Sequence, residues 1–119
     1  MLRVAIVSMA LTLAASAQAD SHCFQAAGTL KPNAQAFYPL TLQQGVLTLI
    51  TVNGNGKSDL DCYLLVKAEE GKAWHVLGKD ESDLDSCSIG GYIKTDKPLK
   101  LWVLNNGTGS DTYTVTVDQ

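Results

Sequence analysis

The sequence has few residues of the kinds that carry catalysis or bind polyanions. It contains two histidines, and the patterns Gly-x-Ser-x-Gly, His-Glu-x-x-His and Cys-x-x-Cys do not occur in it. Its nine basic residues form no cluster and are outnumbered by twelve acidic ones, which makes nucleic acid and anionic membranes poor partners. A catalytic nucleophile needs a base within hydrogen-bond reach, and no motif provides that pair. We therefore predict that the protein is not an enzyme.

Long apolar runs are also missing, apart from one at the N-terminus. Residues 4–15 follow Arg3 and lead to Ala17 and Ala19, the small residues that precede a signal-peptidase cut. The run is too short to span a bilayer, so we expect no membrane insertion. We predict that residues 1–19 are a signal peptide and that residues 20–119 form a single periplasmic or secreted domain. This mature part has eight basic and twelve acidic residues, a formal charge of −4.

Helical periodicity is absent outside the signal peptide. The mature chain instead consists of about eight short apolar runs separated by turns rich in glycine, asparagine and proline. Alternate residues of 60–66 and of 113–117 are apolar, which is the pattern of a half-buried strand. Pro39 has no N–H to donate, so its strand is predicted to lie at a sheet edge. The pattern predicts an all-β, antiparallel sandwich or barrel.

Two long segments resemble one known family. "GTLKPNAQAFYPLTLQQGVLTLITVNGNGKSDLDCYLL" (28–65) and "LKLWVLNNGTGSDTYTVTV" (99–117) are similar to the bacterial pre-peptidase C-terminal domain. The resemblance implies a jelly-roll-like β-sandwich of about eight strands. It also implies an accessory or ligand-binding role beside secreted hydrolases, in some members with bound calcium. Cys62 stands where the family more often has leucine.

Acidic residues suggest where such a calcium ion would bind. Asp59 and Asp61 are spaced i, i+2, so on a strand both face the same side, which we expect to be the outer one. The acidic loop that follows could add carboxylate oxygens, the ligands that Ca²⁺ prefers. The candidate ligands are Asp59, Asp61, Asp80, Asp83 and Asp85. The alternative is a solvated acidic face that keeps the sheet soluble.

Three cysteines remain after export into an oxidising compartment. One disulfide and one free thiol is the simplest outcome, and three pairings exist. We favour Cys62–Cys87, because both residues lie on the apolar phase of their predicted strands. Cys23 would then be free or would pair with another chain.

His22 suggests a second metal. If the mature chain begins at Asp20, the terminal amine, two amide nitrogens and the third-residue imidazole form a square-planar nitrogen set. That geometry suits Cu(II) or Ni(II).

Four apolar residues lie out of phase with the core in their strands and are candidates for a partner-binding face: Phe37, Leu65, Trp102 and Leu104. Gathered on one outer face, they would form an apolar patch of the kind that marks a partner site. If these four residues are scattered singly over the surface or covered by loops, they do not indicate a partner site. We predict an exported, non-catalytic binding or accessory domain for a protein, cell-wall or polysaccharide ligand. The alternative is an inhibitor of a hydrolase such as lysozyme.

Overall fold

The computed structural model describes residues 22–68 and 73–119, so the predicted signal peptide and cleavage site lie outside the described residues. All regular elements in the described part are strands, as the sequence predicts. They are β1 (Phe24–Leu30), β2 (Gln35–Leu40), β3 (Leu47–Asn53), β4 (Leu60–Lys67), β5 (Trp74–Asp80), β6 (Ser86–Tyr92), β7 (Leu99–Asn105) and β8 (Asp111–Asp118). Over these two ranges, no helix has the length and apolarity needed to cross a membrane.

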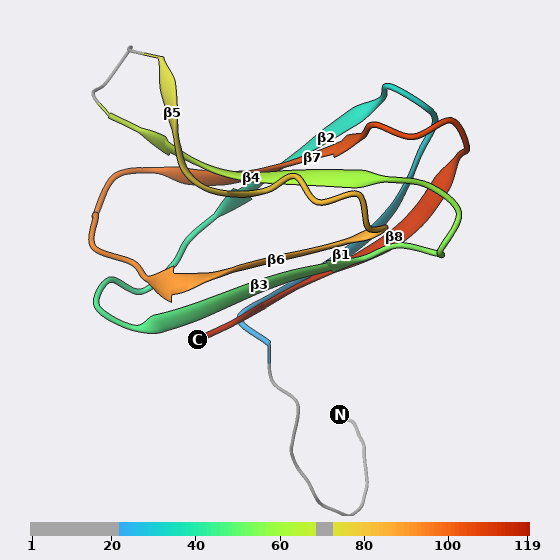
Figure 1. Cartoon of the computed structure of the whole chain (residues 1–119). Coiled ribbons are helices and arrows are strands. Elements are labelled where there is room, and N and C mark those ends of the chain that lie inside the picture. The colour runs from blue at the N-terminus through green and yellow to red at the C-terminus, as the bar shows by residue number, and fades with distance from the viewer. Residues whose placement is uncertain (1–21, 69–72) are drawn as a thin grey trace, which may run out of the picture.

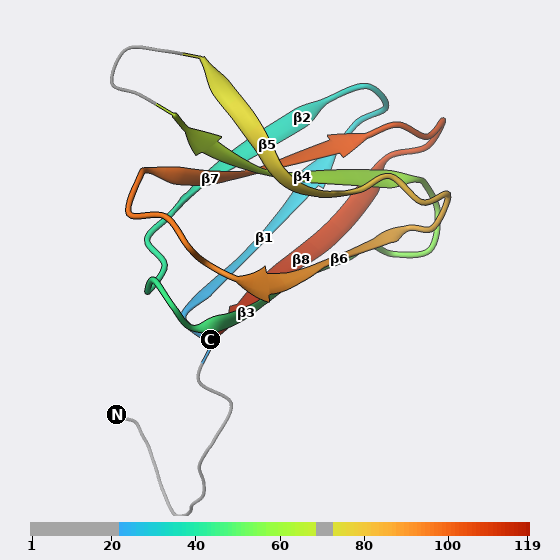
Figure 2. The same cartoon turned by 60° about the vertical axis from the view of Figure 1, so that its left-hand side comes forward.

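The strands form two four-stranded sheets that pack face to face (Figures 1 and 2). Sheet A has the order β1-β8-β3-β6 and sheet B the order β2-β7-β4-β5, with every pair antiparallel. Every connection except the one between β4 and β5 crosses from one sheet to the other. This is the jelly-roll arrangement of eight strands, which confirms the predicted fold class. The strand that contains Pro39, β2, lies at an edge, as expected.

The core fills the space between the sheets. Exposure alternates along β7 and β8, because successive side chains of a strand point to opposite faces. The inward residues that are fully buried include Val52, Leu101, Val103, Val115 and Val117. Each such side chain contributes about 1.5–3 kcal/mol relative to the exposed state. β-Branched residues dominate because they pack well on a pleated surface.

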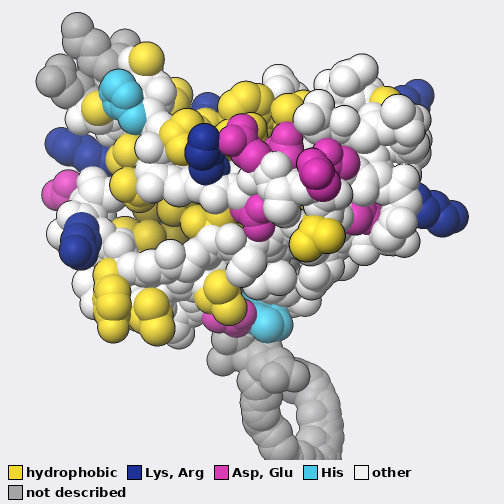
Figure 3. All heavy atoms as spheres, viewed as in Figure 1, with side chains coloured by type: hydrophobic (Ala, Val, Ile, Leu, Met, Phe, Trp, Pro, Cys, Tyr) yellow, Lys and Arg dark blue, Asp and Glu magenta, His cyan; other side chains and the backbone are white. Residues whose placement is uncertain are grey.

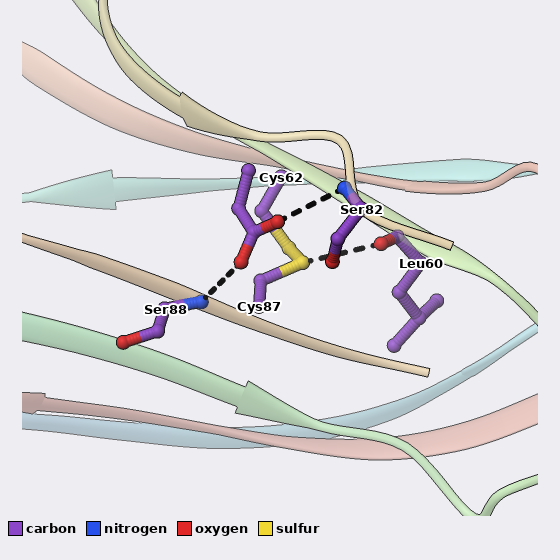
Figure 4. Close-up of a disulfide and its surroundings, with 6 residues drawn as sticks. Leu60, Cys62, Ser82, Cys87 and Ser88 are labelled. Carbon is purple, nitrogen blue, oxygen red and sulfur yellow. Dashed lines mark hydrogen bonds between the residues drawn. A yellow bond between two sulfur atoms is a disulfide. The ribbon is translucent and has the colours of Figure 1, made fainter. Parts of the chain in front are cut away.

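The disulfide joins the two sheets. Cys62 on β4 of sheet B bonds Cys87 on β6 of sheet A, with a Cα–Cα distance of 6.1 Å, which confirms the predicted pairing. Cys87 Sγ lies 3.3 Å from the carbonyl oxygen of Leu60, in the same buried region (Figure 4). Cys23 is free and exposed. The crosslink therefore holds β6, an edge strand, against the opposite sheet.

A single buried amide, at the C-terminal end of β7, connects three chain segments. Asn105 is fully buried, and its Nδ2 donates to the carbonyl oxygens of Leu30 and Gly109 at 2.9 and 2.8 Å. Its Oδ1 accepts from Ser58 Oγ at 2.6 Å and from the N–H of Gly107 at 3.0 Å. These four bonds satisfy the whole hydrogen-bonding capacity of the side chain. Asn105 thus fixes the β3–β4 and β7–β8 links, which lead to Asp59 and Asp111.

Candidate functional site

Two carboxyl groups meet at one end of the sandwich and hold a glycine-rich turn. The N–H of Asn55 donates to Asp111 Oδ1 at 3.0 Å, and the N–H of Gly56 donates to Asp85 Oδ2. A Cβ atom on Gly54 would lie 2.4 Å from Asp85 Oδ2, so only glycine allows the turn to approach this carboxylate. We call Asp85 and Asp111 the carboxyl pair.

The carboxyl pair has an unusual protonation equilibrium. Asp111 is fully buried, and burial, a hydrogen bond with Asp85 and the charge of Asp85 raise its pKa to about 6. Asp85 Oδ1 and Asp111 Oδ2 are buried and accept no hydrogen bond from the described residues. Two adjacent buried carboxylates repel each other when both are ionised, whereas one proton between them makes a hydrogen bond. Asp111 therefore keeps its proton up to about pH 6, where an ordinary aspartic acid is ionised.

Asp61 corrects one expectation. It was predicted to face solvent on the outer side of its strand, yet it is only 6% exposed. Asn106 Nδ2, from the β7–β8 link, donates to Asp61 Oδ2 at 3.3 Å. Burial and then the charge of Asp59 raise the pKa of Asp61, and burial followed by Asp83 raises that of Asp59. Strand phase places Asp61 on the outer face correctly, but a link distant in sequence covers that part of the face.

The other predicted calcium ligands are not gathered around one point. Asp80 accepts the N–H groups of Ser82 at 3.0 Å and Ser88 at 2.9 Å, which hold its pKa below the ordinary value (Figure 4). Asp83 is exposed. In the part of the chain that the structure describes, no three His, Cys, Asp or Glu side chains form a group that could hold a metal ion. Figure 3 shows several Asp and Glu side chains gathered on one part of the visible face.

Asp111 is a site residue that the sequence reasoning missed. It lies on the same phase as Tyr113, Val115 and Val117, all of which are buried. A carboxylate on the apolar phase of a strand is unusual, because a buried charge needs a partner. The position of Asp111 on the apolar phase of its strand is the sequence feature that could have identified it as a buried carboxylate.

A row of stacked aromatic rings lies on the outer face of sheet B. Strand register places Phe37 opposite Trp102 and Trp102 opposite Tyr63. The ring centroids of Phe37 and Trp102 are 5.9 Å apart with an interplanar angle of 17°, and those of Tyr63 and Trp102 are 4.7 Å apart at 30°. Neighbouring strands are about 4.8 Å apart, so these rings stand on the sheet and stack against one another. We call Phe37, Trp102 and Tyr63 the aromatic row.

The four residues predicted for a partner-binding face differ in exposure, and their role in binding stays a prediction. Phe37 is 45% exposed, and Trp102 and Leu104 are half-buried. Leu65 was wrongly placed in an exposed patch, because it is only 7% exposed. The register of β4 with β7 is unbroken at Leu65, which pairs with Lys100, so Leu65 keeps its outward direction and is buried by its neighbours on that face.

A groove of about 760 Å³ continues from the aromatic row at the end of sheet B. Its lining includes Phe37, Pro39, Leu42, Trp74, Lys97 and Lys100. Lys100 Nζ lies 4.7 Å from the ring centroid of Phe37 and 4.2 Å from that of Trp74, at cation–π distance. Among the described residues, Lys100 takes part in neither of the two ion pairs. The sequence reasoning missed Trp74 and Lys100, which come together only in the folded chain.

Tyr63 ends the aromatic row with a polar contact. Its hydroxyl donates to Glu81 Oε2 at 2.5 Å, and Glu81 also pairs with Lys79 at 3.0 Å. The hydrogen bond raises the pKa of Tyr63 to about 12. The row thus runs from an exposed phenyl ring at one edge to a charged pair at the other.

His22 contacts Asp118 through its Nδ1 atom, on the other sheet. The terminal residues that would complete a copper site lie outside the described residues, so copper binding stays a prediction. His75 is exposed on β5. The two histidines are therefore associated with edge strands of different sheets.

No protein-family model matches the chain, and no curated protein matches it. Among solved structures, it is similar to Aeromonas hydrophila PliG, a periplasmic lysozyme inhibitor of g-type lysozyme. The two share 18% identity over 82% of this chain and 85% of that chain, with a TM-score of 0.56.

Two further structures are similar. The Yersinia pseudotuberculosis-derived mitogen shares 12% identity over 80% of this chain and 83% of that chain, with a TM-score of 0.56. The pre-peptidase C-terminal domain of a collagenase from Bacillus anthracis shares 14% identity over 80% and 88%, with a TM-score of 0.55. Identities this low concern the fold alone. The β-sandwich resemblance seen in the sequence is thereby confirmed at the level of fold.

Proposed function

We propose that this protein is an exported, non-catalytic domain that binds a protein ligand through the aromatic row and the adjoining groove. The observation that carries the proposal is the aromatic row itself, in which Phe37 remains 45% exposed although Trp102 stacks on it. Exposed aromatic residues beside a groove are the usual anchors of a binding surface. The amine of Lys100 in that groove forms no ion pair among the described residues and would favour a ligand with a carboxylate.

The stacking geometry favours a protein over a polysaccharide. A sugar ring packs on a free aromatic face, but Phe37 and Tyr63 occupy the two faces of Trp102. The row therefore presents mainly ring edges and apolar side chains to a ligand. Such a surface suits the irregular apolar side chains of a protein partner better than a row of pyranose rings.

Export to the periplasm or the cell exterior is part of the proposal. The Cys62–Cys87 disulfide supports it, because disulfides persist in oxidising compartments. The predicted signal peptide also supports export. Inhibition of a hydrolase is a narrower form of the same hypothesis, and the fold shared with an inhibitor of g-type lysozyme makes that enzyme the first protein ligand to test.

The experiment uses the oxidised mature chain, residues 20–119, immobilised and exposed to the exported proteins of its source. We expect one or more proteins to be captured and then to bind in purified form. Phe37→Ala should weaken that binding at least about tenfold, because truncating an aromatic anchor costs about 2 kcal/mol or more. Lys100→Glu should weaken it as well, whereas Leu84→Ala, which alters an exposed leucine on the β5–β6 link, should bind as the wild type does.

Two results would contradict the proposal. One is a captured protein that binds Phe37→Ala and wild type equally. The other is co-sedimentation with insoluble peptidoglycan, lost in Phe37→Ala, with no protein captured, since that would make the ligand a polysaccharide. In a lysis assay with g-type lysozyme, unchanged lysis would remove only the inhibitor hypothesis.

We propose separately that Ca²⁺ takes the place of the proton held by the carboxyl pair. Its support is that Asp85 Oδ1 and Asp111 Oδ2 are two of four buried carboxylate oxygens that accept no hydrogen bond from the described residues. Carboxylate oxygens are the ligands Ca²⁺ prefers, and backbone carbonyls and water commonly complete its coordination. Asp85 belongs to the set predicted from the sequence, and Asp59 Oδ1 and Asp61 Oδ1 of that set are likewise buried without a hydrogen bond from the described residues.

Thermal melting with Ca²⁺ or with a chelator tests the calcium proposal. We expect Ca²⁺ to raise the melting temperature of the wild type and of Asp83→Asn, because Asp83 is exposed. Asp111→Asn should show no such rise. An unchanged wild-type melting temperature, or an equal rise in Asp111→Asn, would exclude a site at the carboxyl pair.

A further inference from the structure

We propose that two copies of this chain associate through their β6 strands and so join two A sheets into one continuous sheet. β6 lies at the outer end of sheet A and pairs with β3 alone. Such an edge presents unpaired N–H and C=O groups to another chain. The proposal is independent of the ligand site, which lies on the outer face of sheet B.

The segment Gly90–Tyr92 is the open part of this edge. The N–H of Ser88 donates to Asp80 Oδ2 at 2.9 Å, so the backbone polar groups of Ser88 point away from β3. In an antiparallel pair this direction alternates from residue to residue, so Gly90 and Tyr92 also turn their N–H and C=O groups outward. Both residues are exposed. Asp80 therefore closes the edge at Ser88 and leaves the next four backbone groups for another strand.

The composition of β6 favours strand pairing. Ser86–Tyr92 contains neither a charged residue nor a proline, whereas the edge strand β2 contains Pro39 and the edge strand β5 contains Lys79 and Asp80. Charges and prolines are the features that keep edge strands from pairing. β1 also lacks them, but no exposed large apolar side chain of the described residues lies on β1 or on its neighbour β8.

Exposed apolar side chains surround the β6 edge instead. Of the seven exposed large apolar residues in the described part of the chain, five lie on β6, on its partner β3 or on β5, the edge strand of sheet B: Leu47, Leu49, Val76, Leu77 and Tyr92. Figure 3 shows apolar side chains gathered at the end of the molecule where β6 finishes. A patch of this kind marks an interaction surface.

One register between the two β6 strands allows both backbone hydrogen bonds and side-chain contacts. With Gly91 of one copy opposite Gly91 of the other, each Gly90 faces the Tyr92 of the second copy, and each facing pair exchanges two backbone hydrogen bonds. Because Gly90 has no side chain, the tyrosine ring can lie across it and reach Leu49. Leu49 Cδ1 is 3.6 Å from the position of a Cβ on Gly90. An aromatic ring that covers an edge glycine stabilises strand pairing.

Charge complementarity selects a second copy as the occupant. The same register brings Lys94 of one copy opposite Ser88 of the other, where the Asp80 carboxylate is bound. The contact occurs twice, since a two-fold interface uses the same surface patch on both subunits. The edge therefore carries the apolar, hydrogen-bonding and charged partners that its own copy requires.

Sedimentation velocity of the mature chain tests the proposal, with Cys23→Ser in every sample so that no intermolecular disulfide forms. Concentrations run from about 1 µM to about 1 mM. We expect reversible dimers for this parent and a dissociation constant raised at least about tenfold by Tyr92→Lys, which places two like charges in the interface. Leu84→Lys is the matched control: Leu84 is 65% exposed and Tyr92 62%, but Leu84 lies on the β5–β6 link, so dimerisation should be unchanged.

Amide hydrogen exchange of the parent chain gives a second measurement that needs no mutation in β6. The amides of Gly90 and Tyr92 should become protected as the protein concentration rises. A parent that stays monomeric at about 1 mM overturns the proposal. So does a dimer that Tyr92→Lys and Leu84→Lys affect equally, or one that leaves those two amides unprotected. If Tyr92→Lys fails to fold, the exchange result decides.

Discussion

Replacement of Asp111 by asparagine tests the physical account of the carboxyl pair. Asparagine keeps the size of the side chain and an acceptor for the Asn55 N–H, but it carries no charge at any pH. Asp111 has a pKa of about 6 in the folded protein and an ordinary value of 3.8. The folded chain therefore binds this proton more tightly than the unfolded chain does. The stabilising contribution is complete below about pH 3.8 and is lost as the pH rises through about 6.

The magnitude follows from the difference between the two pKa values. About two pKa units correspond to about 3 kcal/mol, since each unit is worth about 1.4 kcal/mol. The wild type should lose about this much free energy of unfolding between pH 4 and pH 7.5. Asp111→Asn should lose far less, and at pH 7.5 it should be the more stable protein by up to about 3 kcal/mol.

Urea unfolding at several pH values between 4 and 8 measures this effect, with the disulfide intact and a chelator present. Asp96→Asn is the control, because it removes the same formal charge at an exposed position on the β6–β7 link. Its pH profile should run parallel to that of the wild type. The reasoning fails if Asp111→Asn also runs parallel to the wild type, or if it is the less stable protein at pH 7.5.

Three further changes probe the structure. Removal of the disulfide by Cys62→Ala with Cys87→Ala should lower the free energy of unfolding by about 3.5 kcal/mol in urea titrations, because the bond closes a loop with a sequence separation of 25; a loss below about 1 kcal/mol would contradict the chain-entropy account. Asn105→Leu should lower the free energy of unfolding by about 3 kcal/mol or more, since buried groups lose four hydrogen bonds. An unchanged urea midpoint would show that these bonds contribute little to stability. Gly54→Ala should displace the Asp85 carboxylate, which a Cβ would approach to 2.4 Å, and so flatten the pH dependence of stability between pH 4 and 7; a wild-type pH profile would disprove that contact.

Local chemistry alone predicts much of this fold. The two-residue alternation along 113–117 assigns Tyr113, Val115 and Val117 to the core, and all three are buried. Pro39 identifies an edge strand because it cannot donate to a ladder on both sides. The apolar phase of Cys62 and Cys87 favours their pairing, since both thiols point into the same core. These results depend only on properties local to one strand: the direction of a side chain or the absence of an N–H.

Tertiary structure decides what lies over each side chain. Asp61 leaves its strand outward as expected, but Asn106 from a later link helps to bury it. Leu65 also keeps the outward phase of its strand, opposite Lys100 of β7, and is nevertheless only 7% exposed. Asp111 finds its partner Asp85 only through the packing of the β5–β6 link against the start of β8.

The candidate binding surface illustrates the same division. The sequence by itself determined that the side chains of Phe37 and Trp102 point away from the core. Only the pairing of β2 with β7 and of β7 with β4 stacked them with Tyr63, because strand register brings together residues that are far apart in the chain. Side-chain direction is a property of each strand, whereas neighbours and burial are properties of the assembled sheets.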